Sequence, residues 1–135
     1  MDNTVGGDDS CSSLGFGILG KTMTGTTDFV VTIDAAYPSH LYLKVKNTGT
    51  SDIVKVEVKA SAGGVDYFDG EPIRLDTNAA VSSDKPIRPG EEVQLKVSFD
   101  QTQPSVGTRL TVSIRCIFAD GRVVVHGMPA IIQSL

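Results

Sequence analysis

Two runs in the middle of the chain alternate apolar and polar side chains with a period of two residues. They occupy residues 41–46 and residues 54–59. Such alternation is typical of β-strands with one buried and one solvent-facing side. The residues between them, 47–52, are polar and contain Gly49. This pattern predicts a β-hairpin with one apolar and one charged face.

The same alternation returns in residues 93–99 and is strongest in residues 109–118. One face of the second run carries only Leu110, Val112, Ile114, Cys116 and Phe118. The opposite face carries Arg109, Thr111, Ser113 and Arg115, so we expect this run to be the best core strand of the protein. A turn at residues 119–121 should lead into a strand at 122–126, and residues 129–135 are expected as one last strand.

Turn signals between these runs indicate the fold class. The chain has 14 Gly and 6 Pro, and no segment repeats apolar residues with helical spacing. Short strands with a turn signal roughly every 8 to 12 residues fit a sandwich better than a barrel. We therefore expect an all-β, immunoglobulin-like two-sheet antiparallel sandwich of about seven to nine strands. At 135 residues the chain has room for one such domain, placed at residues 21–135.

Residues 1–20 are expected to form an N-terminal arm. Its first part is polar and rich in small residues, whereas Leu14, Phe16 and Ile18 alternate with glycines. An extended chain of this kind presents one apolar face and one bare face. Two interpretations fit: a donor strand lent to a neighbouring subunit, or the first strand of the protein's own sheet.

The two cysteines, Cys11 and Cys116, leave a second alternative open. A disulfide between them would tie the arm to the core and would indicate an oxidising, extracellular setting. The other interpretation is two unrelated thiols, with Cys116 acting as a small buried apolar residue.

Charge and motifs exclude several classes of function. The net charge is −4, and Lys and Arg alternate with other residues instead of clustering, which disfavours nucleic acid. No run of about 20 apolar residues is present, so we expect no direct membrane insertion by this chain. Catalytic and cofactor-binding motifs are missing as well, and we expect no enzyme activity and no cofactor.

A metal site is not expected either. His40 and His126 are the only histidines, and neither has a second ligand at the spacing that zinc requires. Asp66, Asp69 and Glu71 lie near one turn, but this array is too short for a calcium loop, so we interpret it as a solvated turn.

One combination of turns and strands resembles a known group of proteins. Residues 43–53 contain an Asn-Thr-Gly turn at Asn47, and a Pro-Gly-Glu turn at Pro89 precedes an alternating strand. Gly107, the strand after it and the 119–121 turn complete the pattern. It resembles the immunoglobulin-like globular domains of archaeal surface-filament proteins, namely archaellins, pilins and their accessory stator proteins. The long apolar N-terminal helix of archaellins and pilins is missing from this sequence.

The resemblance implies a non-enzymatic structural subunit or domain of an extracellular filament or cell-surface assembly. Its partners would be further copies of itself or other surface-layer and filament proteins, joined through strand edges and the N-terminal arm. The alternative is an envelope-anchored or secreted binding module. Such a module would recognise a protein or glycan through its loops, notably residues 62–72 and 100–107.

Overall fold

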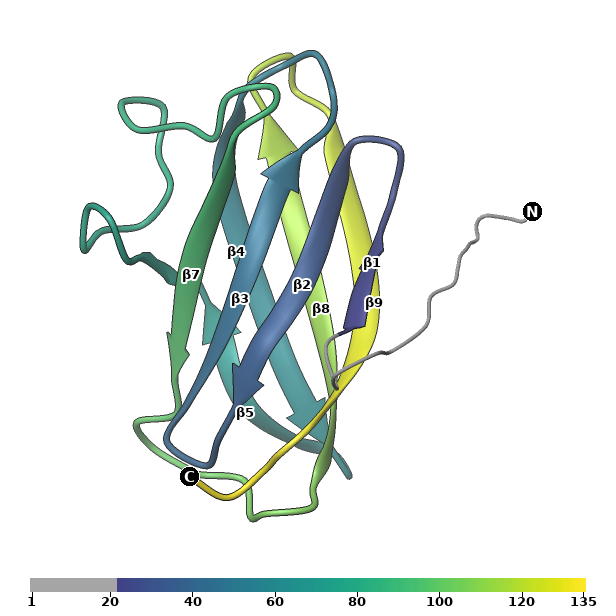
Figure 1. Cartoon of the computed structure of the whole chain (residues 1–135), viewed down its shortest axis with the longest axis vertical. Coiled ribbons are helices and arrows are strands. Elements are labelled where there is room, and N and C mark those ends of the chain that lie inside the picture. Colours follow the sequence, from purple (N-terminus) through teal and green to yellow (C-terminus); the bar gives the residue numbers. More distant parts are fainter. Residues whose placement is uncertain (1–21) are drawn as a thin grey trace.

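The computed structural model describes residues 22–135 as two antiparallel β-sheets packed face to face (Figure 1). Within this range the strands are β1 (Thr22–Gly25), β2 (Phe29–Ala36), β3 (His40–Asn47), β4 (Ile53–Ala62), β5 (Val65–Gly70), β6 (Ile73–Arg74), β7 (Glu92–Ser98), β8 (Arg109–Phe118) and β9 (Val123–Ile131). The predicted arm, with Cys11, Leu14, Phe16 and Ile18, lies outside the described residues.

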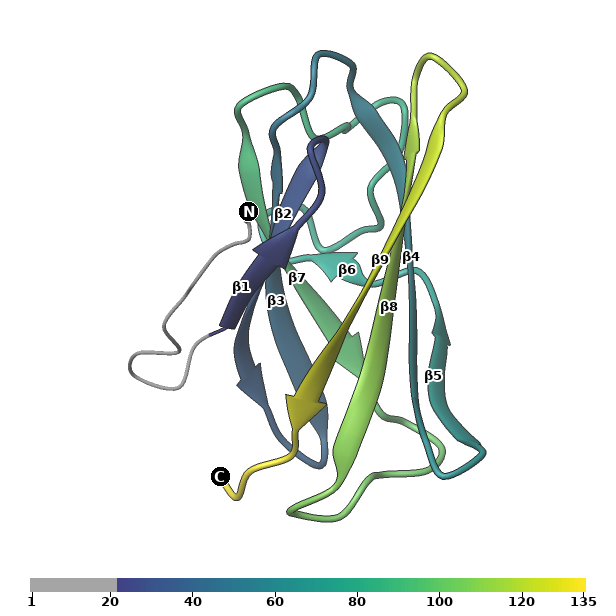
Figure 2. The same ribbon diagram turned by 90° about the vertical axis from the view of Figure 1, so that its right-hand side faces the viewer.

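The order of the strands identifies the type of sandwich. The first sheet has the order β1-β2-β3-β7-β6, and the second has the order β5-β4-β8-β9. Figure 2 shows the two layers from the side. If β2 is taken as strand A, the sheets contain A-B-E-D and C′-C-F-G, which is the immunoglobulin arrangement, with β1 as an extra edge strand. The predicted fold class, an all-β immunoglobulin-like two-sheet antiparallel sandwich, is confirmed.

The predicted hairpin between residues 41–46 and 54–59 is wrong, because the two runs lie in different sheets. β3 pairs with β2 and β7, whereas β4 pairs with β5 and β8. The connection between them crosses from one sheet to the other. Alternation shows that each strand has one buried face, but it does not say which strand lies beside it.

The buried Asn47 side chain holds this crossover in place. Its Nδ2 donates hydrogen bonds to the main-chain carbonyls of Ser51 and Ile87, both at 2.8 Å, and its Oδ1 accepts one from the N–H of Gly49 at 3.0 Å. A buried amide with all these partners fixes the path of the connection.

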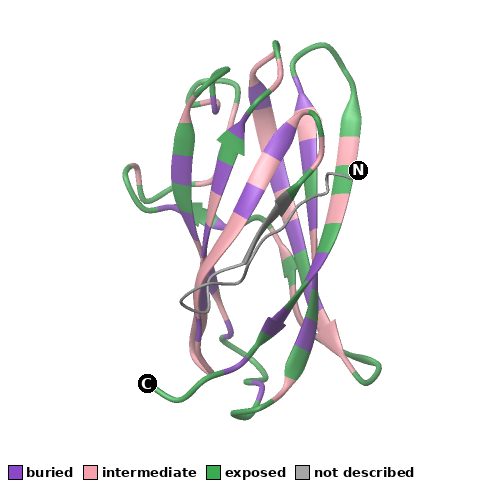
Figure 3. Cartoon of the chain, turned by 45° about the vertical axis from the view of Figure 1, so that its right-hand side comes forward, coloured by how far each residue is buried: buried purple, intermediate pink, exposed green. Residues whose placement is uncertain are grey.

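The core lies between the sheets and is formed by the inward faces of the alternating strands (Figure 3). The five apolar positions predicted for one face of residues 109–118 are all at most 1% exposed. On β7, Leu95 and Val97 are fully buried. The predictions for these two strands are therefore confirmed, because a sheet with one packed face requires apolar residues at every second position.

Arg74, on the short edge strand β6, is the largest buried polar side chain in the described range. Its guanidinium donates to the carbonyls of Lys85 and Pro86 at 2.8 and 3.1 Å and pairs with Asp76 through two hydrogen bonds of 3.0 and 2.9 Å. The hydrogen bonds that Arg74 donates to Asp76 are the main cause of a raised pKa for Arg74. These contacts bind the long connection between β6 and β7 to the sandwich.

The last strand departs from the sequence interpretation. Residues 122–126 and 129–135 were expected as separate strands, but β9 is one strand that continues through Pro129. The hairpin that precedes it has the predicted turn, where Gly121 adopts a positive φ of 91°. Proline is tolerated at this position because β9 is an edge strand. No helix that could cross a membrane occurs in residues 22–135.

Candidate functional site

The residues chosen from the sequence do not meet in one site. Cys116 is fully buried among core residues of the second sheet, and burial raises the pKa of its thiol to about 12. Cys11 lies outside the described residues, so the pairing of the two cysteines stays a prediction. The same holds for the assembly role of Leu14, Phe16 and Ile18.

The histidines lie in separate aromatic environments. His40 stacks edge-on against Tyr37 and Tyr42, with ring centroids 5.4 and 4.7 Å away. His126 meets the ring of Phe29 at 6.4 Å, and burial lowers its pKa. Within residues 22–135 no three His, Cys, Asp or Glu side chains are grouped so that they could hold a metal ion.

The most unusual surface of the described chain is the free edge of β9. Its outward-facing residues are Val123, Val125, Gly127, Pro129 and Ile131, and we call this row the β9 edge. Its three large side chains are 46%, 57% and 53% exposed. The alternate residues point inward, where Met128 and Ala130 are buried. An edge strand thus carries apolar side chains on both faces.

Hydrogen bonds at the two ends of β9 define which main-chain groups point to its free side. The carbonyl of Arg122 accepts from Phe118, and Ile132 exchanges hydrogen bonds with the connection before β8 at 2.9 and 2.7 Å. Main-chain groups of even-numbered residues therefore point toward β8. Those of odd-numbered residues point the other way, as shown at the end of the strand, where the N–H of Gln133 donates to Ala36 of β2 at 2.8 Å. The N–H and C=O groups of the β9 edge consequently point away from β8, toward the free side of the sheet.

Charge distinguishes this edge from the other edge of the same sheet. Residues 123–131 contain no Asp, Glu, Lys or Arg, whereas the opposite edge of the same sheet, β5, carries Asp66 and Asp69. Proteins usually protect long edge strands with charges, and here only Pro129 serves that purpose. The nearest charges on the same face are Arg109 and Arg115 of β8, which lie opposite Ile131 and Val125.

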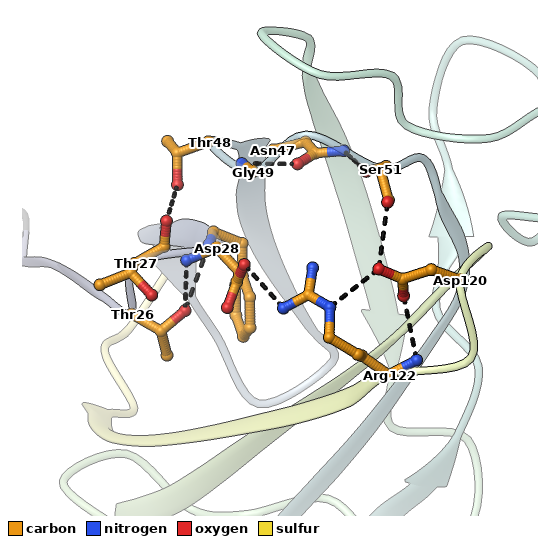
Figure 4. A network of polar contacts seen from close by, with 10 residues as sticks. Thr26, Thr27, Asp28, Asn47, Thr48, Gly49, Ser51, Asp120 and Arg122 are labelled. Carbon is orange, nitrogen blue, oxygen red and sulfur yellow. Dashed lines mark hydrogen bonds and ion pairs between the residues drawn. The ribbon is translucent and has the colours of Figure 1, made fainter.

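A network of polar contacts fixes the start of β9 (Figure 4). Arg122 pairs with Asp120 at 2.9 Å and with Asp28 at 3.0 Å, and its guanidinium lies 4.9 Å from the centre of the Phe118 ring. Ser51 of the crossover donates to Asp120 at 3.2 Å. The hydrogen bond from Arg122 is the main cause of a lowered pKa for Asp120. Three connections at one end of the sandwich are thereby joined.

A groove on the opposite side of the sandwich brings together the two loop regions expected from the sequence. Its volume is about 380 Å³, and it lies between β5 and the segment that follows β7. Its lining consists of Asp66, Tyr67, Phe68, Asp69, Ser98, Asp100, Gln101 and Thr102. The loop regions 62–72 and 100–107 are therefore neighbours in space, although only part of each lines the groove.

Neither a protein-family model nor a curated protein matches this chain. The strand order establishes the sandwich fold, and no family is identified. The function must therefore be inferred from the surfaces described above, of which the β9 edge was missed in the sequence. Its signal was nevertheless available, because residues 123–131 form an uncharged run after the last predicted hairpin turn.

Proposed function

We propose that this protein is a non-enzymatic structural subunit or domain of an extracellular filament or cell-surface assembly, and that it associates through strand edges and its N-terminal arm. The observation that supports the proposal is the β9 edge. It combines outward main-chain donors and acceptors with exposed valine and isoleucine side chains.

Such an edge favours association for two physical reasons. A strand added to it would satisfy main-chain groups that otherwise face water, and alternate side chains of the added strand would cover the apolar row. An edge without charges also does not repel an approaching partner electrostatically. β9 is rigidly held at both ends, by the Arg122 network and by the hydrogen bond from Gln133 to Ala36, so little order must be gained on binding.

The resemblance to archaeal surface-filament domains supports the same function. The two turns on which it rests are in contact: the N–H of Gly90 donates to the carbonyl of Asn47 at 2.7 Å, and the N–H of Asn47 donates to Glu91 at 2.9 Å. Together they close one end of the sandwich. An extracellular location and surface-layer or filament partners follow from this resemblance as part of the proposal.

Size-exclusion chromatography with light scattering, together with negative-stain microscopy, tests the proposal on the full-length chain. We expect assembly that increases with concentration and that is lost in Val125→Lys. Val106→Lys is the matched control, because Val106 is also 57% exposed but lies in a loop. A variant with Leu14, Phe16 and Ile18 changed to Ser tests the arm. A wild-type chain that stays monomeric at every concentration would contradict the proposal.

The groove supports a second candidate, a secreted or envelope-anchored binding module. Tyr67 and Phe68 supply apolar ring surface beside the carboxylates of Asp66, Asp69 and Asp100. Aromatic rings next to hydrogen-bond acceptors suit a glycan or a basic peptide segment. Screening a glycan array and a lysine-rich peptide against wild type and Tyr67→Ala tests this candidate. Binding that is equal for both proteins, or absent from both, argues against it.

A further inference from the structure

We propose that the occupant of the β9 edge is a second copy of this chain, paired antiparallel along β9 with the two-fold axis at Gly127. The inference rests on the proposed function, because it names the partner and the register of the same edge. It would join the β5-β4-β8-β9 sheet of one copy to the same sheet of the other copy, giving one continuous sheet of ordinary size.

The row of outward side chains is symmetric about Gly127. A two-fold axis at this residue places Val123 opposite Ile131 of the second copy and Val125 opposite Pro129. Every exposed apolar side chain of the row thus meets another one. An isologous interface requires this self-complementarity, since each residue must suit its symmetry-related partner.

The main-chain groups agree with the same register. The odd-numbered residues have outward N–H and C=O groups, and this axis sets odd residues opposite odd residues. The N–H groups of Val123, Val125, Gly127 and Ile131 then each meet a carbonyl of the partner. Pro129 has no N–H, so in each copy the carbonyl of Val125, which faces Pro129 of the other copy, is the one group that gains no donor in this register.

Electrostatics does not oppose the pairing. The strand contains no formal charge, and Arg109 and Arg115 lie one strand further from the seam, on β8. Arg115 is also within 3.7 Å of Glu57 on β4. Two copies can therefore approach along β9 without setting like charges directly opposite each other.

The rival occupant is the N-terminal arm, from the same chain or from another. The described chain begins at β1, and β1 and β9 are the edges on the same side of the sandwich, since β9 contacts β2 across the core. An arm bound along β9 would have no two-fold symmetry at Gly127. Symmetry is therefore the property that an experiment must detect.

Single cysteines introduced along β9 of the full-length chain test for this two-fold symmetry. With Cys11→Ser as background, Gly127→Cys should form a covalent dimer under mild oxidation, because directly opposite Cα atoms are about 5.5 Å apart, within disulfide range. The new Cβ has room, with Val112 O at 4.0 Å as its nearest neighbour. Val123→Cys alone should not crosslink, since its symmetry mates would be roughly 27 Å apart. A mixture of Val123→Cys and Ile131→Cys should crosslink, because the two-fold axis places these two residues opposite each other.

We expect at least about tenfold more covalent dimer for Gly127→Cys than for Val106→Cys, the exposed loop control. Equal crosslinking of these two variants would overturn the two-fold axis. If Val125→Lys still abolished assembly in that case, the β9 edge would remain the association surface and the proposed function would stand. A monomeric wild type that forms no specific crosslink would overturn both.

Discussion

Replacing Asn47 tests whether one buried amide holds the crossover between the sheets. Asn47→Ala removes three hydrogen bonds and leaves the carbonyl of Ser51 and the N–H of Gly49 without those partners. The carbonyl of Ile87 keeps a second partner, the N–H of Ile53 at 2.9 Å. At about 1 kcal/mol for each hydrogen bond, and more for a polar group left unpaired, we expect a loss of about 2–4 kcal/mol.

Asn47→Asp should cost more, although it preserves the shape of the side chain. Both carboxylate oxygens only accept hydrogen bonds, so one of them would face the carbonyls of Ser51 and Ile87 at a fully buried position. Burial should raise the pKa of the new carboxyl. The folded variant then binds a proton at this carboxyl more readily than the unfolded variant does, so the stability of the variant should rise as the pH falls.

Urea unfolding followed by far-UV circular dichroism, at one fixed protein concentration, measures these losses. Thr48→Ala is the matched control, because this exposed neighbour makes one long hydrogen bond of 3.3 Å and should change stability by less than about 0.5 kcal/mol. A loss for Asn47→Ala as small as that of the control would refute the reasoning. The crossover would then be held by its main-chain contacts.

Three further predictions concern single side chains. Arg74→Met should lower stability by about 2–4 kcal/mol, because its guanidinium is buried and pairs with main-chain carbonyls. Arg122→Met should cost less than Arg74→Met in the same urea assay, and less still in high salt, because its ion pairs are exposed. In a Cys11→Ser background, a thiol reagent should react with Cys116 only after unfolding, as stopped-flow absorbance would show. Burial lowers the pKa of His126 in the folded protein, so as the pH falls the unfolded chain takes up a proton at this residue before the folded chain does. The free energy of unfolding should therefore fall as the pH drops below 6.5, and His126→Gln should make this dependence on pH less steep.

The sequence predicted the faces of the strands well and their neighbours poorly. Residues 93–99 and 109–118 could be interpreted because burial of one side of a sheet leaves a period of two in the side chains. No comparable pattern in the sequence identifies which strand lies beside a given strand. The connection after Asn47 therefore looked like a hairpin turn, although its asparagine is buried and joins two sheets.

The candidate site was harder to predict for a related reason. β9 carries apolar residues on both faces, so nothing in the sequence distinguishes inward Met128 and Ala130 from outward Val125 and Ile131. Pro129 also divided the strand in two at the sequence level, since a missing N–H normally ends pairing. Only the position of β9 at the edge, with the main-chain groups of Pro129 directed outward, removes that objection.

The crossing of the chain between the sheets has a kinetic consequence. The central pairs are β3 with β7 and β4 with β8, which join residues such as Leu43 to Leu95 and Val56 to Cys116, about fifty to sixty positions apart along the chain. Large loops must therefore close before either sheet gains its best contacts. We expect refolding in milliseconds to seconds, with the uncharged β9 strand added by its local hairpin to β8 and exposed to other chains until the sandwich closes.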